Sequence, residues 1–321
     1  KMCGCRNSRK DYPTRCQLAM ITLMPTIEVI ALPMLVVSVI CFLLLINKRC
    51  RNTNWHKNQF IGTEKFIVYR TNPKKYYDVA NVGSQSALFA FDYESFEVKG
   101  CNWAVGSESL LYNFRIIKQY FDCLRDNGTV IITLCPFVFC LHDYTDYRLK
   151  TKYHLYLDPK TVDGSTILKS HFRIKFPLLT SPIQALKRLI KDVPIDNRSS
   201  LTTNEMSQED LEKDASKWVD NWKRQFSVSN LDAPVPQSNR DAINFNTKLL
   251  CEMMSFCVEH NLKPVLVLPP VTTALSSKFS EKFCESYLDS VICKSNKLKV
   301  PFLNYFRDTR FSDNTLFFNS Y

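Results

Sequence analysis

Asp78-Val-Ala-Asn-Val-Gly-Ser-Gln-Ser86 is the stretch of sequence on which the fold prediction depends. Its first five residues have the pattern of a short buried strand, and Gly83 follows where the carboxyl end of that strand would open into a turn. A second strand is predicted over 129–134 (TVIITL), because a β-branched, apolar run is typical of a buried parallel strand. Between them, the sequence predicts a short strand near 102–105 and an amphipathic helix over 107–124. This order of elements predicts an α/β fold.

The same alternation returns in the last third of the chain. Helices are predicted over 240–260 and 279–293, and strands over 265–268 and 300–303. The region 140–236 is richer in tyrosine and proline and is predicted to be an insertion, with one charged helix over 207–226. Strands that alternate with helices over short connections predict a three-layer α/β/α domain with a parallel, flavodoxin-like sheet. Ligands of such sheets bind at the carboxyl ends of the strands.

The segment 29–46 (VIALPMLVVSVICFLLLI) contains eighteen residues without a charge. At about 1.5 Å per residue this length matches a hydrocarbon core of about 30 Å, and the segment lacks the polar face of a buried core helix. Asn47, Lys48 and Arg49 follow as a polar stop, which favours a retained transmembrane helix over a cleaved signal peptide. Basic residues flank both ends, so the orientation in the membrane stays open. The predicted organisation is a basic segment 1–28, the transmembrane helix 29–46, a linker 47–75 and an α/β domain 76–321.

The positive charge is concentrated around this apolar segment. Residues 1–57 carry nine basic and two acidic side chains, a net charge of +7, whereas the whole chain has a formal charge of +11. The sequence therefore indicates membrane lipid, rather than nucleic acid, as the partner of the basic residues. The thirteen cysteines form no CxxC pair, so neither a metal site nor a disulfide framework is predicted. The chain has seven glycines and no glycine-rich phosphate loop, and no cofactor is predicted.

The turn after Val82 carries a family resemblance. An apolar strand that ends in Gly83-Ser84, after a single N-terminal span, resembles the first sequence block of the SGNH (GDSL-type) hydrolases. It is most similar to their membrane-anchored branch, which includes the D-alanyl transfer protein of lipoteichoic acid synthesis. Asn102-Trp-Ala-Val-Gly106 resembles the second block, and the resemblance covers roughly 76–136 and 240–321. It implies a serine nucleophile, a histidine base from a late Asp-x-x-His motif, and an oxyanion hole made by the amides of Gly83 and Gly106.

The sequence departs from this pattern at the nucleophile. The family's serine position falls on Gln85, whose amide cannot form an acyl-enzyme, and Ser84 and Ser86 flank it. Either serine is a candidate nucleophile if the turn rearranges by one residue.

The late motif departs as well. Asp313 lies in the tail that resembles the approach to the last block, but Leu316 stands where the base is expected, and no histidine follows His260. Outside the motifs, His142 is interpreted as a loop residue. Glu108 is interpreted as an acidic residue that complements the dipole of the following helix.

Two functions remain open from the sequence. The resemblance implies a membrane-anchored protein that modifies envelope polysaccharide or teichoic acid by acyl-ester hydrolysis or transfer, with Ser84 or Ser86 attacking. The alternative is a catalytically inactive relative, a pseudoenzyme that binds glycan or docks an integral-membrane acyltransferase. In both cases the α/β domain is expected on the extracytoplasmic side of the membrane.

Overall fold

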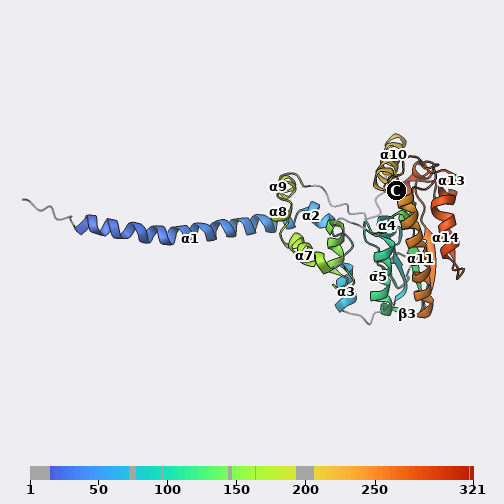
Figure 1. Ribbon diagram of the computed structural model, residues 1–321, viewed down its shortest axis with the longest axis horizontal. Coiled ribbons are helices and arrows are strands. Elements are labelled where there is room, and N and C mark those ends of the chain that lie inside the picture. The colour runs from blue at the N-terminus through green and yellow to red at the C-terminus, as the bar shows by residue number, and fades with distance from the viewer. Residues whose placement is uncertain are drawn as a thin grey trace, which may run out of the picture.

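A five-stranded, all-parallel sheet lies at the centre of the folded part of the chain (Figure 1). The computed structural model describes residues 15–71, 77–95, 97–143, 147–162, 164–192, 206–317 and 319–321. The strands are β1 (Tyr77–Val82), β2 (Gly100–Asn102), β3 (Leu124–Thr133), β4 (Lys263–Leu268) and β5 (Phe302–Asn304). Their spatial order β2-β1-β3-β4-β5 is that of flavodoxin-like doubly wound folds. The predicted α/β fold with a parallel sheet is confirmed.

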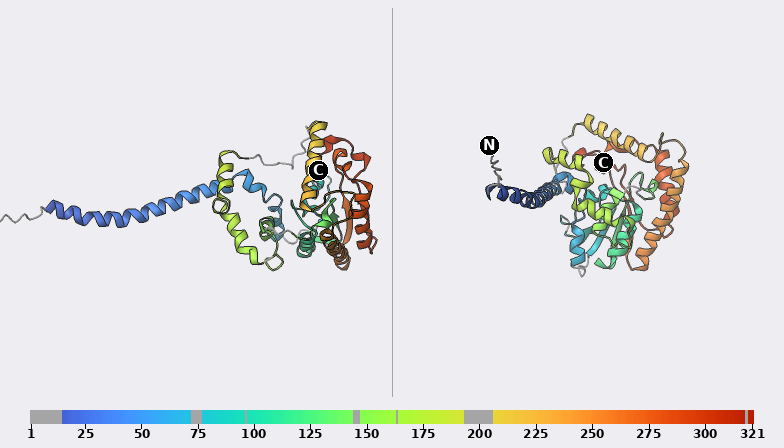
Figure 2. Two further views of the ribbon diagram at one scale, coloured as in Figure 1. Left: turned by 45° about the horizontal axis from the view of Figure 1, so that its top comes forward. Right: turned by 60° about the vertical axis from the view of Figure 1, so that its left-hand side comes forward.

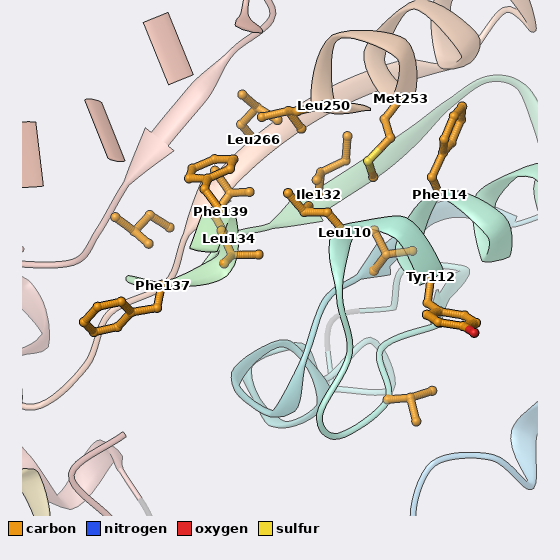
Figure 3. Close-up of a cluster of buried hydrophobic side chains, with 14 of the residues drawn as sticks. Leu110, Tyr112, Phe114, Ile132, Leu134, Phe137, Phe139, Leu250, Met253 and Leu266 are labelled. Carbon is orange, nitrogen blue, oxygen red and sulfur yellow. The ribbon is translucent and has the colours of Figure 1, made fainter. Parts of the chain in front are cut away.

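Long helices pack against the sheet through apolar side chains. Helix α11 (Gln237–Glu259) contacts β4, and it also contacts α5 (Leu110–Tyr120) and α14 (Ser290–Ser295). Figure 3 shows this core, in which side chains of α5, β3, α11 and β4 meet. Its buried residues include Leu110, Ile132, Leu250, Met253 and Leu266. Burial of these side chains on both sides of the central strands explains why the strands read as continuous apolar runs.

Strand β3 is longer than predicted because it contains an irregularity. Tyr77 pairs with Leu124 and Val79 with Thr129, so the pairing register shifts between these two positions. Within the extra residues, Asn127 has a left-handed φ of 61°, a conformation that asparagine tolerates better than most residues. The Asn127-Gly128 pair therefore lies inside the strand, and α5 ends at Tyr120, before the predicted end of the helix at residue 124.

The segment 47–75, predicted to be a linker, belongs in part to the folded domain. It contains α2 (Asn54–Asn58) and α3 (Lys65–Thr71). Phe66 is fully buried and stacks on Tyr156, with 4.2 Å between the ring centroids and 9° between the planes. The aromatic partner of α3 comes from a distant segment of the chain, so the local sequence pattern does not reveal this packing.

The insertion between β3 and α11 divides into two parts. Helices α7 (Ile167–Lys175), α8 (Pro177–Thr180) and α9 (Pro182–Ile190) lie beside the end of α1, as both Figure 1 and Figure 2 show. Helix α10 (Gln208–Gln225), predicted over 207–226, instead packs on α12 (Thr273–Ser276). The remaining short elements are α4 (Gln85–Ala90), α6 (Tyr147–Lys150), α13 (Glu281–Cys284) and a π-helical turn over Glu285–Asp289.

Helix α1 (Arg15–Arg51) projects away from the rest of the molecule (Figure 1). Its stretch Ala31–Arg51 is long and apolar enough to cross a membrane. Leucine, valine and phenylalanine side chains of this stretch are exposed around the helix, with Leu32 66% and Phe42 61% exposed. The predicted segment 29–46 therefore lies inside one continuous helix.

Candidate functional site

The turn after β1 lies at the carboxyl edge of the sheet and requires glycine. Gly83 has φ +146°, a backbone conformation that side-chain-bearing residues rarely adopt. A Cβ atom at this position would lie 2.6 Å from Ala87 Cβ and 2.9 Å from Thr133 Cβ. The missing side chain therefore lets α4 begin directly after the strand, with Ser84 as its first flanking residue.

The residues after β2 continue alongside β1 as far as this turn. The Trp103 N–H donates to the Asn81 carbonyl at 2.8 Å, and the Val105 N–H donates to the Gly83 carbonyl at 3.2 Å. This pairing brings the loop at Gly106 next to the turn at Gly83. The following residue, Ser107, has a left-handed φ of 56°, a strained conformation of the kind that recurs at functional sites.

A cavity of about 150 Å³ lies at this edge. Its lining joins the turn, the loop after Gly106, the end of β3, helix α10 and the C-terminal tail. The lining residues are Ser84, Gln85, Ser107, Glu108, Cys135, Phe137, Val138, Leu141, Trp218, Trp222, Gln225, Phe226 and Tyr321. Of the residues singled out from the sequence, Ser84, Gln85 and Glu108 line the cavity, whereas Ser86 does not. Gly83 and Gly106 directly precede the lining residues Ser84 and Ser107.

Tyr321 occupies the position beside the two candidate serines. Its hydroxyl donates to Ser86 Oγ at 3.3 Å, and its ring packs against Trp218 and Trp222 at centroid distances of 5.2 and 5.1 Å. Burial raises the pKa of Tyr321 far above its ordinary value, so the phenol stays protonated. Burial likewise raises the pKa of the neighbouring Cys135 thiol. Neither group is therefore available as a base at neutral pH.

Asp313 and the histidines lie elsewhere. The Asp313 carboxylate accepts from the Thr315 N–H at 2.9 Å and from the Thr315 hydroxyl at 2.8 Å. The backbone hydrogen bond lowers the pKa of this carboxylate, which is not among the residues that line the cavity. His142 packs on Phe245 with 3.9 Å between ring centroids, and none of the five histidines of the chain lines the cavity. The described residues thus bring neither Asp313 nor an imidazole to Ser84 or Ser86.

Glu108 has a role that the sequence did not reveal. Helix α5 begins at Leu110, so Glu108 precedes it, and its side chain is buried rather than exposed on the first turn. Neither carboxylate oxygen makes a hydrogen bond of normal geometry with the described residues. Burial raises the pKa of Glu108 well above its ordinary value, although Lys152, Lys65 and the amides of Val105 and Gly83 favour the charged form. Burial therefore favours the neutral form of this carboxyl, which lines the cavity.

Buried Lys152 and partly buried Lys65 hold the loop that carries Glu108. Lys152 Nζ donates to the carbonyls of Gly106 and Ser107, the latter at 2.9 Å, and Lys65 Nζ donates to the Ala104 carbonyl at 2.8 Å. Burial lowers the pKa of each lysine to about 8, and the proximity of Glu108 opposes this shift. No local pattern marks either lysine, because one comes from α3 and the other from the 3₁₀ turn Thr151–Leu155.

Comparisons with protein families, with curated proteins and with solved structures return no match for this chain. The geometry of the cavity is therefore the basis for assigning a function.

Proposed function

We propose that the protein is a single-span membrane protein whose α/β domain binds a carbohydrate group of the cell envelope, without forming an acyl-enzyme. Helix α1 supplies the anchor through Ala31–Arg51, and the α/β domain lies on the extracytoplasmic side. The observation that carries the proposal is the lining of the cavity, in which aromatic rings and side-chain amides adjoin Ser84. The neighbouring Ser86 accepts from the phenol of Tyr321 and has no imidazole beside it among the described residues.

The polar and aromatic groups of the lining suit a sugar ring. Trp218 and Trp222 offer apolar faces for stacking, whereas Gln85 and Gln225 can both donate to and accept from hydroxyl groups. The Glu108 carboxyl, whose oxygens have no hydrogen-bond partner among the described residues, adds a further polar group. Since drug-sized ligands occupy pockets of about 300–1,000 Å³, a cavity of about 150 Å³ fits one small group at the end of a longer chain.

The proton chemistry argues against turnover. A general base must lie about 2.6–3.2 Å from the hydroxyl that it activates and must be deprotonated at working pH. Burial raises the pKa of the phenol beside Ser86 and the pKa of the Glu108 carboxyl, and Lys152 is engaged with backbone carbonyls. Gln85, at the family's nucleophile position, cannot carry an acyl group.

A second candidate function is acyl-ester hydrolysis or transfer on polysaccharide or teichoic acid. The observation that favours it is the position of Ser84 at the carboxyl edge of the sheet, directly after Gly83 and next to the loop at Gly106. A related possibility for the non-catalytic protein is that the same edge docks an integral-membrane acyltransferase.

A binding titration separates these functions. Full-length protein in nanodiscs is titrated with chitotetraose and with glycerol phosphate oligomers, and the fluorescence of Trp218 and Trp222 reports binding. The expected result is a saturable change with at least one of the two probes, weakened about tenfold by Gln85→Ala, whereas the exposed Gln237→Ala on α11 has no effect. Absence of saturation with both probes, together with burst release of nitrophenol from p-nitrophenyl acetate, would favour the hydrolase.

A further inference from the structure

Helices α7, α8 and α9 form an apolar surface that no described part of the chain covers. Five of its large side chains project outward: Leu168 (80% exposed), Phe172 (46%), Leu179 (60%), Ile183 (80%) and Ile190 (89%). Monomeric soluble domains rarely expose so many large apolar side chains together, and such surfaces mark sites that contact a protein or a membrane.

This surface is fixed to the end of the predicted span. Asn47 Nδ2 donates to the Lys175 carbonyl at 2.8 Å, and the Leu178 N–H donates back to Asn47 Oδ1 at 3.1 Å. Cys50 is buried in a small apolar cluster with Leu178 and Ala185. At about 1.5 Å per residue, Asn47 and Cys50 lie within about 6 Å of the end of the charge-free run at residue 46. Helices α8 and α9 therefore lie at the level where the span would leave the hydrocarbon (Figure 1).

Helix α9 has an exposed apolar face with basic side chains beside it. Ile183, Leu186 and Ile190 follow the i, i+3, i+7 spacing that places them on one face, and all three are exposed. Lys187 lies one turn after Ile183 at the edge of this face, and Lys191 follows the helix. A short amphipathic helix with basic residues and no acidic residue has the character of an interfacial membrane helix.

The charge of the whole surface is complementary to anionic lipid. Residues 166–191 contain no aspartate or glutamate. They contain six basic residues, which are Lys169, Arg173, Lys175, Lys187, Arg188 and Lys191. Lys48, Arg49 and Arg51 add three more at the adjoining end of α1. Basic residues close to an anionic membrane surface are attracted to it.

We propose that α7–α9 insert their apolar side chains into the interface of the bilayer that α1 crosses, with their basic side chains at the lipid phosphates. This inference rests on the proposed span and extends it, because the domain then has two rigidly joined membrane contacts. A lipid surface is favoured over a protein partner because the surface is continuous with the span and carries a single sign of charge. The consequence is a fixed orientation of the α/β domain, and of its cavity, relative to the membrane.

Quenching of tryptophan fluorescence by brominated phospholipid tests this orientation. Three variants of the full-length protein are reconstituted in vesicles: Ile190→Trp on α9, Ile40→Trp inside α1, and Leu316→Trp on the exposed tail. The signal of the unsubstituted protein is subtracted, because Trp55 lies near α8. We expect Ile190→Trp to be quenched about twofold or more above Leu316→Trp by lipid brominated close to the headgroup. Phosphatidylglycerol should increase this quenching, and Lys187→Gln with Lys191→Gln should cancel the increase.

The three substituted positions distinguish failure of the interfacial contact from failure of the span. Quenching at residue 40 without quenching at residue 190 would overturn the interfacial contact and leave the span intact. Quenching at neither position would refute the span itself. Protection of residue 190 from brominated lipid, accompanied by cross-linking of α9 to a second copy of the chain, would identify a protein interface in place of lipid.

Discussion

The hydroxyl of Tyr321 lies 3.3 Å from Ser86 Oγ, beside the turn that follows β1. The tail is held there by two further contacts, since the Ser320 hydroxyl donates to Asp214 at 2.6 Å and the Thr272 hydroxyl donates to the Ser320 carbonyl at 2.8 Å. A protonated phenol can donate a hydrogen bond to a serine but cannot activate it. This contact is therefore the structural reason for proposing binding in place of turnover.

Replacement of Tyr321 by phenylalanine should change stability only slightly. The ring keeps its packing on Trp218 and Trp222, and the loss of one hydrogen bond costs about 0.5–1.5 kcal/mol. Urea denaturation measures the difference, and Tyr305→Phe is a matched control on a partly exposed ring. A loss much above this range would mean that the hydroxyl organises the whole edge of the sheet.

Gly83→Ala should be strongly destabilising, by about 2 kcal/mol or more, because the new Cβ meets two atoms below 3.0 Å and the backbone is in a glycine conformation. Gly106→Ala is the matched control. No heavy atom lies within 4 Å of a Cβ built at Gly106, so its stability should stay within about 1 kcal/mol of the parent. Equal denaturation midpoints for the two variants would contradict the described turn.

Glu108→Gln should become more stable, relative to the parent, as the pH rises. The pKa of Glu108 is raised in the folded protein, so folding takes up a proton above the ordinary pKa of about 4.5. The stabilisation is complete below that pH and is lost as the pH rises toward the folded pKa. Denaturation at pH 5 and pH 7 compares the two proteins. A stability difference that is independent of pH would show that Glu108 is ionised in the fold.

Lys65→Met should show the opposite trend. Because burial lowers the pKa of Lys65 from 10.5 to about 8, folding releases a proton between these values. The parent should therefore gain stability relative to Lys65→Met as the pH rises from about 8 to about 10.5. Lys118→Met, at an exposed lysine on α5, is the control for replacing a lysine by methionine.

The sequence predicted the elements whose signal is local. Strand β4 and helices α10 and α11 were expected within a few residues of their bounds, because their apolar periodicity is strong and proline or asparagine marks their ends. The turn at Gly83 could be placed at the carboxyl edge for the same reason. These features depend on residues that are neighbours in the chain.

The features that were missed depend on distant contacts. Phe66 is part of the core only because Tyr156 stacks on it, and the local pattern around residue 66 resembles a connection. Glu108 was interpreted as complementing the dipole of the following helix. In the fold, Lys65, which precedes it in the chain, and Lys152, which follows it, both lie close enough to act on its charge. Burial and charge partners of this kind are properties of the tertiary structure.

Covalent labelling tests the central claim most directly. Full-length protein in nanodiscs is treated with a fluorophosphonate, and the intact mass is measured before and after treatment, with Ser84→Ala and Ser86→Ala in parallel. The account predicts no mass increase at neutral pH, because the described residues place no imidazole beside either serine and the pKa of the nearby Tyr321 phenol is raised. Stoichiometric labelling that disappears in one of the two variants would contradict it and would identify the nucleophile of an active hydrolase.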